Sequence, residues 1–162
     1  MDTGSRLHRL LADRPAPLRD AVIASRMLLR TASLLEQRID AALAPHGLTM
    51  REYLALVLIA DDAIEPLRPS DLGTSLNASR TRITRLLDGL EARGLVRRVP
   101  DQADRRSLHL AQTEAGAALV AAATPLAHAA YLAAWAPLGE DGTRRTGGAL
   151  RRLHEHLTKE AP

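Results

Sequence analysis

Apolar residues recur at the three- and four-residue spacing of amphipathic helices along most of this 162-residue chain. A first helix is predicted over 18–44, with one stripe that carries Leu28, Leu35, Ile39 and Leu43. Further helices are predicted over 49–61, 69–76, 80–93, from 114 onward, and over 140–157. Thr49 and Glu52 have capping-box spacing at the start of the second helix, and Thr113 can cap the helix that begins at Glu114. Pro125 should kink or divide the helix that begins at Glu114.

Two short segments with strand-like alternation follow the helix over 80–93. Gly94 suits the left-handed residue just past that helix, after which Val96–Val99 and Ser107–Leu110 are predicted to form a hairpin. Phe and Cys are absent, so the core must consist mainly of Leu, Ala, Val and Ile, of which Leu and Ala favour helix. The predicted fold class is mainly α with a small β-hairpin wing.

The helix over 80–93 has two contrasting faces. Ile83, Leu86, Leu87 and Leu90 form an apolar stripe, whereas short polar and cationic residues occupy the other side of its N-terminal half: Arg80, Thr81, Arg82, Thr84 and Arg85. A recognition helix in the major groove of DNA needs this division, because Arg can bind guanine and the Thr methyl can contact thymine. Asn77 in the preceding turn and Ser79 at the N-cap are expected to meet the DNA backbone.

The hairpin turn adds a second cationic feature. Arg105 and Arg106 lie side by side there, where they are expected to enter the minor groove, and Asp104 is expected to stiffen the turn. From Arg68 to Arg106 nine Arg stand against five acidic residues, so the basic excess of this +3 chain is concentrated here. A solvated helix face and a solubilising turn would explain each feature alone, but their combination favours DNA binding.

The ordered motifs of this region resemble those of the MarR family of bacterial transcription regulators. The resemblance rests on Leu67–Gly73, Ser79–Leu86, Leu90–Arg98, Asp104–Ser107 and Thr113–Gly116, and it covers roughly 18–157. Three positions depart from the family pattern. Arg68 replaces a frequent Thr N-cap, which predicts a poorly capped helix, Gly73 replaces Ala, and Gln112 replaces Leu.

The resemblance implies a homodimeric winged helix-turn-helix protein with N- and C-terminal dimerisation helices. Segments 18–48 and 113–162 would form the dimer, 49–112 the DNA-binding lobe, and 1–17 an N-terminal extension. The expected dimer residues are Leu119, Leu126, Tyr131, Leu132, Trp135, Leu150, Leu153 and Leu157. Such proteins bind a pseudo-palindromic duplex DNA site, and many respond to a small anionic aromatic ligand, for which no residues are assigned. A repressor is expected here, because a dimer across a promoter blocks polymerase.

Other classes of function find little support in the residues. No phosphate-binding loop or hydrolase motif is visible, so neither an enzyme nor a cofactor is expected. His154 and His156 could suggest zinc, but two residues apart on a helix they point about 200° away from each other. No signal peptide or uninterrupted membrane span is apparent, which favours a cytoplasmic protein. The alternative that remains is a winged-helix protein-interaction module without DNA binding.

Overall fold

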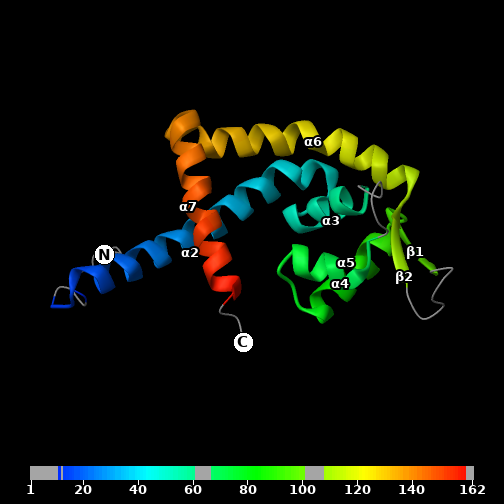
Figure 1. Cartoon of the computed structure of the whole chain (residues 1–162). Coiled ribbons are helices and arrows are strands. Elements are labelled where there is room, and N and C mark those ends of the chain that lie inside the picture. The colour runs from blue at the N-terminus through cyan, green and yellow to red at the C-terminus, as the bar shows by residue number, and fades with distance from the viewer. Residues whose placement is uncertain (1–10, 12, 61–66, 101–107, 160–162) are drawn as a thin grey trace. The chain divides into compact units, whose positions relative to one another are not determined.

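The computed structural model describes residues 11, 13–60, 67–100 and 108–159, and it confirms the predicted fold class (Figure 1). Two compact units divide the chain, residues 1–38 and 39–162. The described elements are the α-helices α2 (Ala16–Leu43), α3 (Met50–Ala60), α4 (Pro69–Ser75), α5 (Arg80–Ala92), α6 (Glu114–Trp135) and α7 (Gly139–Lys159), the 3-10 helices η1 (Ala44–His46) and η2 (Ala136–Leu138), and the strands β1 (Val96–Pro100) and β2 (Leu108–Gln112).

Local sequence signals fix the ends of the helices in the lobe. Gly47 adopts a left-handed φ of 62° after η1 and so separates α2 from α3. Thr49 and Glu52 form the predicted capping box: the Thr49 hydroxyl accepts the Glu52 N–H at 3.2 Å, and the Glu52 carboxylate accepts the Thr49 N–H at 2.8 Å. Gly94, with a φ of 68°, follows the last turn of α5 as predicted.

The backbone N–H groups at the start of α4 are better supplied with hydrogen-bond partners than the sequence indicated. The Arg68 side chain has no acceptor and cannot cap the helix, as expected. However, the Asp71 carboxylate accepts the Arg68 N–H at 3.1 Å, so half of a capping box is present. Pro69 occupies the first helical position, where its missing N–H costs no hydrogen bond. The prediction of a poorly capped helix was therefore wrong in part.

The hairpin consists of β1 and β2 in antiparallel register, with Val96 opposite Gln112 and Pro100 opposite Leu108. The Leu110 N–H also donates to the Leu67 carbonyl at 2.9 Å, which ties the segment before α4 to the outer edge of β2. The hairpin base is thus joined to the helix-turn-helix on one side, and Thr113 leads directly from β2 into α6.

Pro125 was expected to kink or divide the C-terminal helix, and the expected division was wrong. Helix α6 continues through Pro125, which removes only one backbone hydrogen bond, and ends ten residues later at Trp135. Thr113 caps α6 as predicted, since its hydroxyl accepts the Gly116 N–H at 3.0 Å. The division falls instead at η2, where Pro137 stands in a short 3-10 helix before α7.

The buried core extends from the end of α2 through the lobe to the middle of α6. It consists of Leu, Ile and Ala, together with Tyr53 and Val96; the largest fully buried side chains are Ile39, Leu43, Leu56, Ile59, Leu72, Leu87, Leu90 and Leu110. Tyr53 donates to or accepts from Thr124 at 3.1 Å, which connects α3 to α6. Burial, and secondarily the nearby Tyr53, raise the pKa of Tyr131 above its ordinary value. The core therefore holds α3, α5, the hairpin and α6 in one lobe.

Candidate nucleic-acid interface

Helix α5 presents the two faces that its sequence predicts. Ile83, Leu87 and Leu90 are at most 3% exposed, whereas Leu86, predicted to lie in the same stripe, is only half-buried. The five polar and cationic residues of the other side, Arg80, Thr81, Arg82, Thr84 and Arg85, are all exposed. Among the described ion pairs none involves these three arginines. The first two turns of α5 therefore carry three accessible positive charges.

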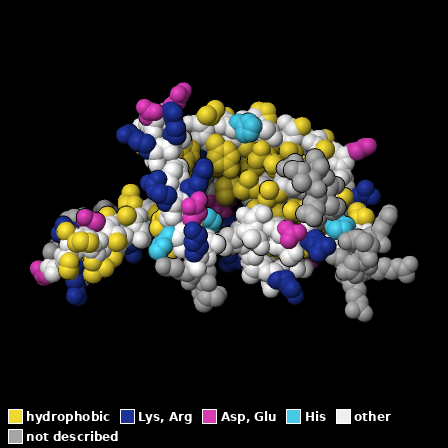
Figure 2. All heavy atoms as spheres, viewed as in Figure 1, with side chains coloured by type: hydrophobic (Ala, Val, Ile, Leu, Met, Phe, Trp, Pro, Cys, Tyr) yellow, Lys and Arg dark blue, Asp and Glu magenta, His cyan; other side chains and the backbone are white. Residues whose placement is uncertain are grey.

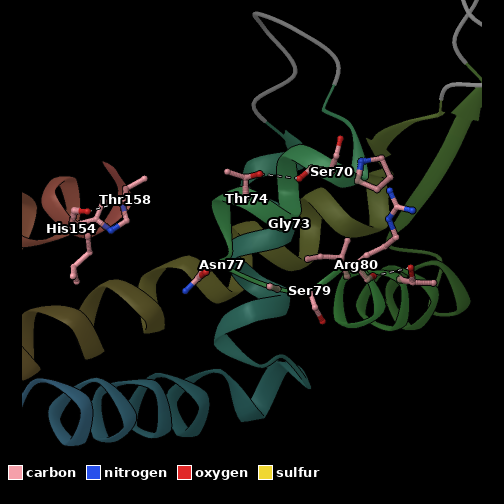
Figure 3. Close-up of a pocket in the computed structure, with 13 residues that line it drawn as sticks. Ser70, Gly73, Thr74, Asn77, Ser79, Arg80, His154 and Thr158 are labelled. Atoms are coloured by element: carbon pink, nitrogen blue, oxygen red, sulfur yellow. Dashed lines mark hydrogen bonds between the residues drawn. The ribbon is translucent and has the colours of Figure 1, made fainter. Parts of the chain in front are cut away.

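The structure distributes these residues over two grooves. Arg80 and Thr84 line a groove with Asn77 and Ser79, bordered by α4 and by His154 and Thr158 of α7 (Figure 3). Arg82 and Arg85 line a second groove against the start of α3, beside Arg51. Thr81 lines neither groove and stands between them on the helix surface. The candidate DNA-reading residues thus cover the full exposed width of the helix.

The turn between α4 and α5 differs in one detail from the prediction. Asn77 adopts a left-handed φ of 46°, a conformation that Asn tolerates better than most residues. Ser79 occupies the N-cap position, but its side chain makes no capping hydrogen bond, contrary to its expected role. Its carbonyl still accepts the Ile83 N–H at 3.0 Å. The exposed Ser79 hydroxyl consequently remains outside the helix hydrogen-bond pattern.

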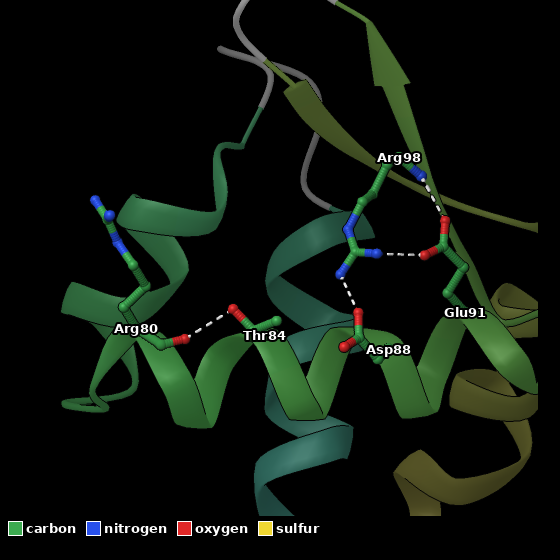
Figure 4. A network of polar contacts seen from close by, with 5 residues as sticks. All are labelled: Arg80, Thr84, Asp88, Glu91 and Arg98. Atoms are coloured by element: carbon green, nitrogen blue, oxygen red, sulfur yellow. Dashed lines mark hydrogen bonds and ion pairs between the residues drawn. The ribbon is translucent and has the colours of Figure 1, made fainter.

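The predicted wing residues Asp104, Arg105 and Arg106 lie outside the described residues. The described base of the wing brings in a residue that the sequence reasoning missed. Arg98 on β1 pairs with Asp88 and Glu91 of α5, with N–O distances of 2.6 Å to each carboxylate (Figure 4). Glu91 and Arg98 both belong to the Leu90–Arg98 motif, so the sequence contained the two partners from which this ion pair could have been predicted.

Further contacts fix α5 and the wing within the lobe. Arg93 at the end of α5 pairs with Glu52 of α3 at 3.0 Å. Gln112, where the family pattern has Leu, donates from its side chain to the Leu56 carbonyl at 3.2 Å. This departure therefore links β2 to α3. Helix α5 is held on both flanks by charged or polar contacts in addition to its buried stripe.

Metal ligands do not gather in the part of the chain that the structure describes. No group of three or more His, Asp or Glu side chains suited to a metal occurs there. His154 and His156 are exposed on α7, and His154 borders the groove next to Arg80.

A short helix, a tight turn, a longer cationic helix and an antiparallel hairpin define a winged helix-turn-helix protein. A family model described as the MarR family matches residues 46–107. The transcriptional repressor MprA of Escherichia coli is 30% identical over 136 residues, which are 84% of this chain and 77% of MprA. The chain therefore belongs to the MarR family of transcriptional regulators, which are not enzymes.

Solved structures of the family have the same fold. AbsC, a MarR family transcriptional regulator from Streptomyces coelicolor, superposes with a TM-score of 0.76 at 30% identity, over 85% of this chain and 93% of AbsC. CouR from Rhodococcus jostii RHA1, whose structure contains p-coumaroyl-CoA, gives a TM-score of 0.69 at 28% identity, over 78% of this chain and 88% of CouR. The likeness extends well beyond the winged lobe.

Proposed function

We propose that this regulator is a homodimeric repressor that binds a pseudo-palindromic duplex DNA site and is released by a small anionic aromatic ligand. The observation that carries the proposal is the exposed cationic N-terminal half of α5, whose three arginines take part in none of the ion pairs among the described residues. Two such helices in a dimer would read half-sites about one helical turn apart. Occupation of a promoter by the dimer would block transcription, in keeping with the repressor name of the relative MprA.

Each exposed residue in the first two turns of α5 has a proposed part in DNA recognition. Arg82 and Arg85 would bind guanine edges, and Arg80 would do so from the α4 side. Thr81 and Thr84 would contact thymine methyl groups, while Asn77 and Ser79 would donate to phosphates. Arg105 and Arg106 would reach the minor groove, with Asp104 as their structural support.

The dimer is proposed from apolar side chains that the single chain leaves uncovered. None of the eight expected dimer residues on α6 and α7 is buried, and the exposed fraction reaches 75% at Leu132 and 59% at Leu157. Figure 2 shows hydrophobic side chains at the surface along α6. In the N-terminal unit, 71% of Leu29 is exposed on α2. Segments 18–48 and 113–162 are proposed to bury these side chains in the dimer around the lobe 49–112.

The apolar surface of α6 and α7 also bears on location. The segment Glu114–Lys159 contains an 18-residue window apolar enough to cross a membrane by length and composition, of which 17% is buried. The sequence expectation had found no uninterrupted span. A dimer interface explains the same surface in a family of DNA-binding regulators, and a cytoplasmic location is therefore proposed.

A ligand is proposed from relatives, with no residues assigned. The structure of CouR with p-coumaroyl-CoA contains an aromatic acyl group on an anionic carrier. Such a ligand would weaken DNA binding only if it binds more tightly to an arrangement of the dimer that does not fit the operator. Its expected signature is a loss of DNA affinity when an aromatic acid is added.

Titration of a labelled duplex from upstream of the chain's own gene tests DNA binding. Affinity should fall steeply with salt, because phosphate contacts release counterions. Arg82→Ala or Arg85→Ala should each cost about 1–3 kcal/mol and relax base preference, and the Arg105→Ala, Arg106→Ala pair should weaken binding with less change in preference. Arg151→Ala on α7 changes charge equally and serves as the control.

Salt-independent affinity, or undiminished affinity in the α5 variants, would favour the alternative of a winged-helix protein-interaction module. Dimerisation is tested separately by sedimentation at several concentrations. Leu132→Glu should shift the protein towards monomer, because it places a charge in the proposed apolar interface. An unchanged molar mass of a folded Leu132→Glu variant would contradict the proposed dimer surface.

A further inference from the structure

The ion pairs of Arg98 join the wing to the exposed face of the recognition helix. One terminal nitrogen of the guanidinium lies 2.6 Å from the Asp88 carboxylate and the other lies 2.6 Å from that of Glu91 (Figure 4). The Arg98 side chain is 27% exposed, compared with 56% for Asp88. A single partly buried cation on β1 therefore holds two acidic side chains from successive turns of α5.

The position of Asp88 makes this pairing relevant to DNA. At about 100° per residue, Thr81, Arg85 and Asp88 fall along one line of α5, opposite the buried residues Ile83 and Leu87. An unpaired carboxylate on this line would face the phosphates beside a bound helix and repel them. It would also oppose the attraction due to the arginines one to two turns earlier.

We propose that Arg98 is a positioning residue of the DNA-binding surface. It holds the carboxylates of Asp88 and Glu91 away from the nucleic acid and offsets their charge, so that α5 can approach the groove. The inference rests on the proposed DNA binding but assigns a role to a strand residue that does not itself contact DNA. Both terminal nitrogens of Arg98 are already occupied by short charge-assisted hydrogen bonds.

A matched control exists at the end of the same helix. Arg93 also pairs with a carboxylate across elements, that of Glu52 at 3.0 Å, and its side chain is 37% exposed. Its partner lies on α3 rather than on the outward line of α5. Glu52 borders the groove of Arg82 and Arg85, but its other carboxylate oxygen accepts the Thr49 N–H at 2.8 Å and so stays held. Loss of Arg93 therefore removes the same charge and a comparable ion pair without freeing the acidic side chain.

The test compares Arg98→Met, Arg93→Met, and a triple variant that combines Arg98→Met with Asp88→Asn and Glu91→Gln. Circular dichroism first identifies a temperature at which all are folded. Fluorescence anisotropy then measures affinity for the upstream duplex and for a duplex of unrelated sequence at several salt concentrations. Arg98→Met should lose about tenfold in affinity at low salt and less at high salt, where repulsion is screened.

The triple variant should recover to within about threefold of the wild type, since the repelling carboxylates are gone, and Arg93→Met should bind nearly as the wild type does. Undiminished binding by Arg98→Met, or a triple variant as weak as Arg98→Met, would overturn the inference. The second result would mean that Arg98 contacts phosphate or acts only through the fold. A wild type that binds neither duplex would instead overturn the proposed function, and this inference with it.

Discussion

Gly116 stands at the corner where α6 leaves the wing, and no larger residue fits there. A Cβ atom built on Gly116 would lie 2.2 Å from the Leu95 carbonyl oxygen and 2.9 Å from Cγ of Gln112. The Leu95 oxygen cannot move freely, because it accepts the Thr113 N–H at 3.1 Å. The Thr113 hydroxyl also donates to the Gly94 carbonyl at 2.7 Å. Gly116→Ala must therefore open a corner that several hydrogen bonds hold closed.

The expected cost follows from these contacts. Overpacking of a closed site costs about 1–3 kcal/mol. Each hydrogen bond stretched by the displacement of Leu95 adds about 0.5–1.5 kcal/mol. The better helix propensity of Ala returns about 1 kcal/mol. We expect Gly116→Ala to lower the free energy of unfolding by about 2–3 kcal/mol, which corresponds to a Tm lower by roughly 5–10 °C in a chain of this length.

Thermal and urea unfolding measured at one protein concentration test this expectation, because dimerisation makes Tm depend on concentration. Gly89→Ala in α5 is the matched control, since nothing lies within 4 Å of its added Cβ. That variant should gain about 0.4–1 kcal/mol. If Gly116→Ala proves as stable as Gly89→Ala, the close packing of α6 on the α5–β1 corner does not exist in solution.

Three further outcomes are expected. Thr113→Val should cost about 1–2 kcal/mol in urea unfolding, because it removes both the cap on Gly116 and the bond to the Gly94 carbonyl; an unchanged midpoint would contradict the capping role. Gly73→Ala should raise stability by about 0.5 kcal/mol, since its Cβ would meet the nearest atom at 3.4 Å and helix propensity improves; a lower Tm would show that this contact does not relax. Burial raises the pKa of Tyr131 in the folded protein. The neutral side chain therefore stabilises the fold fully below its ordinary pKa of 10.0, and this stabilisation is lost as pH rises through the higher pKa of the folded state. Tyr131→Phe should therefore lose less stability than the wild type between about pH 8 and about pH 11, and equal losses would refute this assignment.

The features that the sequence predicted well depend on neighbouring residues. The capping box at Thr49, the left-handed Gly94 and the cap at Thr113 each involve groups within a few positions of one another. The two faces of α5 follow from helical periodicity in the same way, and its buried stripe was predicted except for the half-buried Leu86. Interactions between residues close in the sequence, together with the periodicity of the α-helix, are sufficient for such predictions.

The missed features depend on how elements pack. Pro125 has the same local effect wherever it stands, but whether a helix continues past it depends on the contacts around it. The Thr124 hydroxyl donates to the Val120 carbonyl at 2.7 Å and meets Tyr53 of α3. Ser79 has the residue type and position of a cap, yet its hydroxyl makes no bond to the helix. Residue preference predicts the position of a cap better than it predicts the hydrogen bond.

Arg98 shows the same limit at the candidate site. Strand alternation places Arg97 and Arg98 on opposite faces of β1, and the helical repeat places Asp88 on the outward line of α5. Neither pattern predicts that Arg98 contacts Asp88. Their contact depends on the crossing of β1 over the last turns of α5, which Gly94 sets by reversing the chain within one left-handed residue. A net charge counted along this region treats Arg98 as free to attract phosphate. In the folded lobe its charge is already engaged by Asp88 and Glu91, so under the proposed function the attraction for DNA would come from the arginines at the other end of the helix and from Arg105 and Arg106.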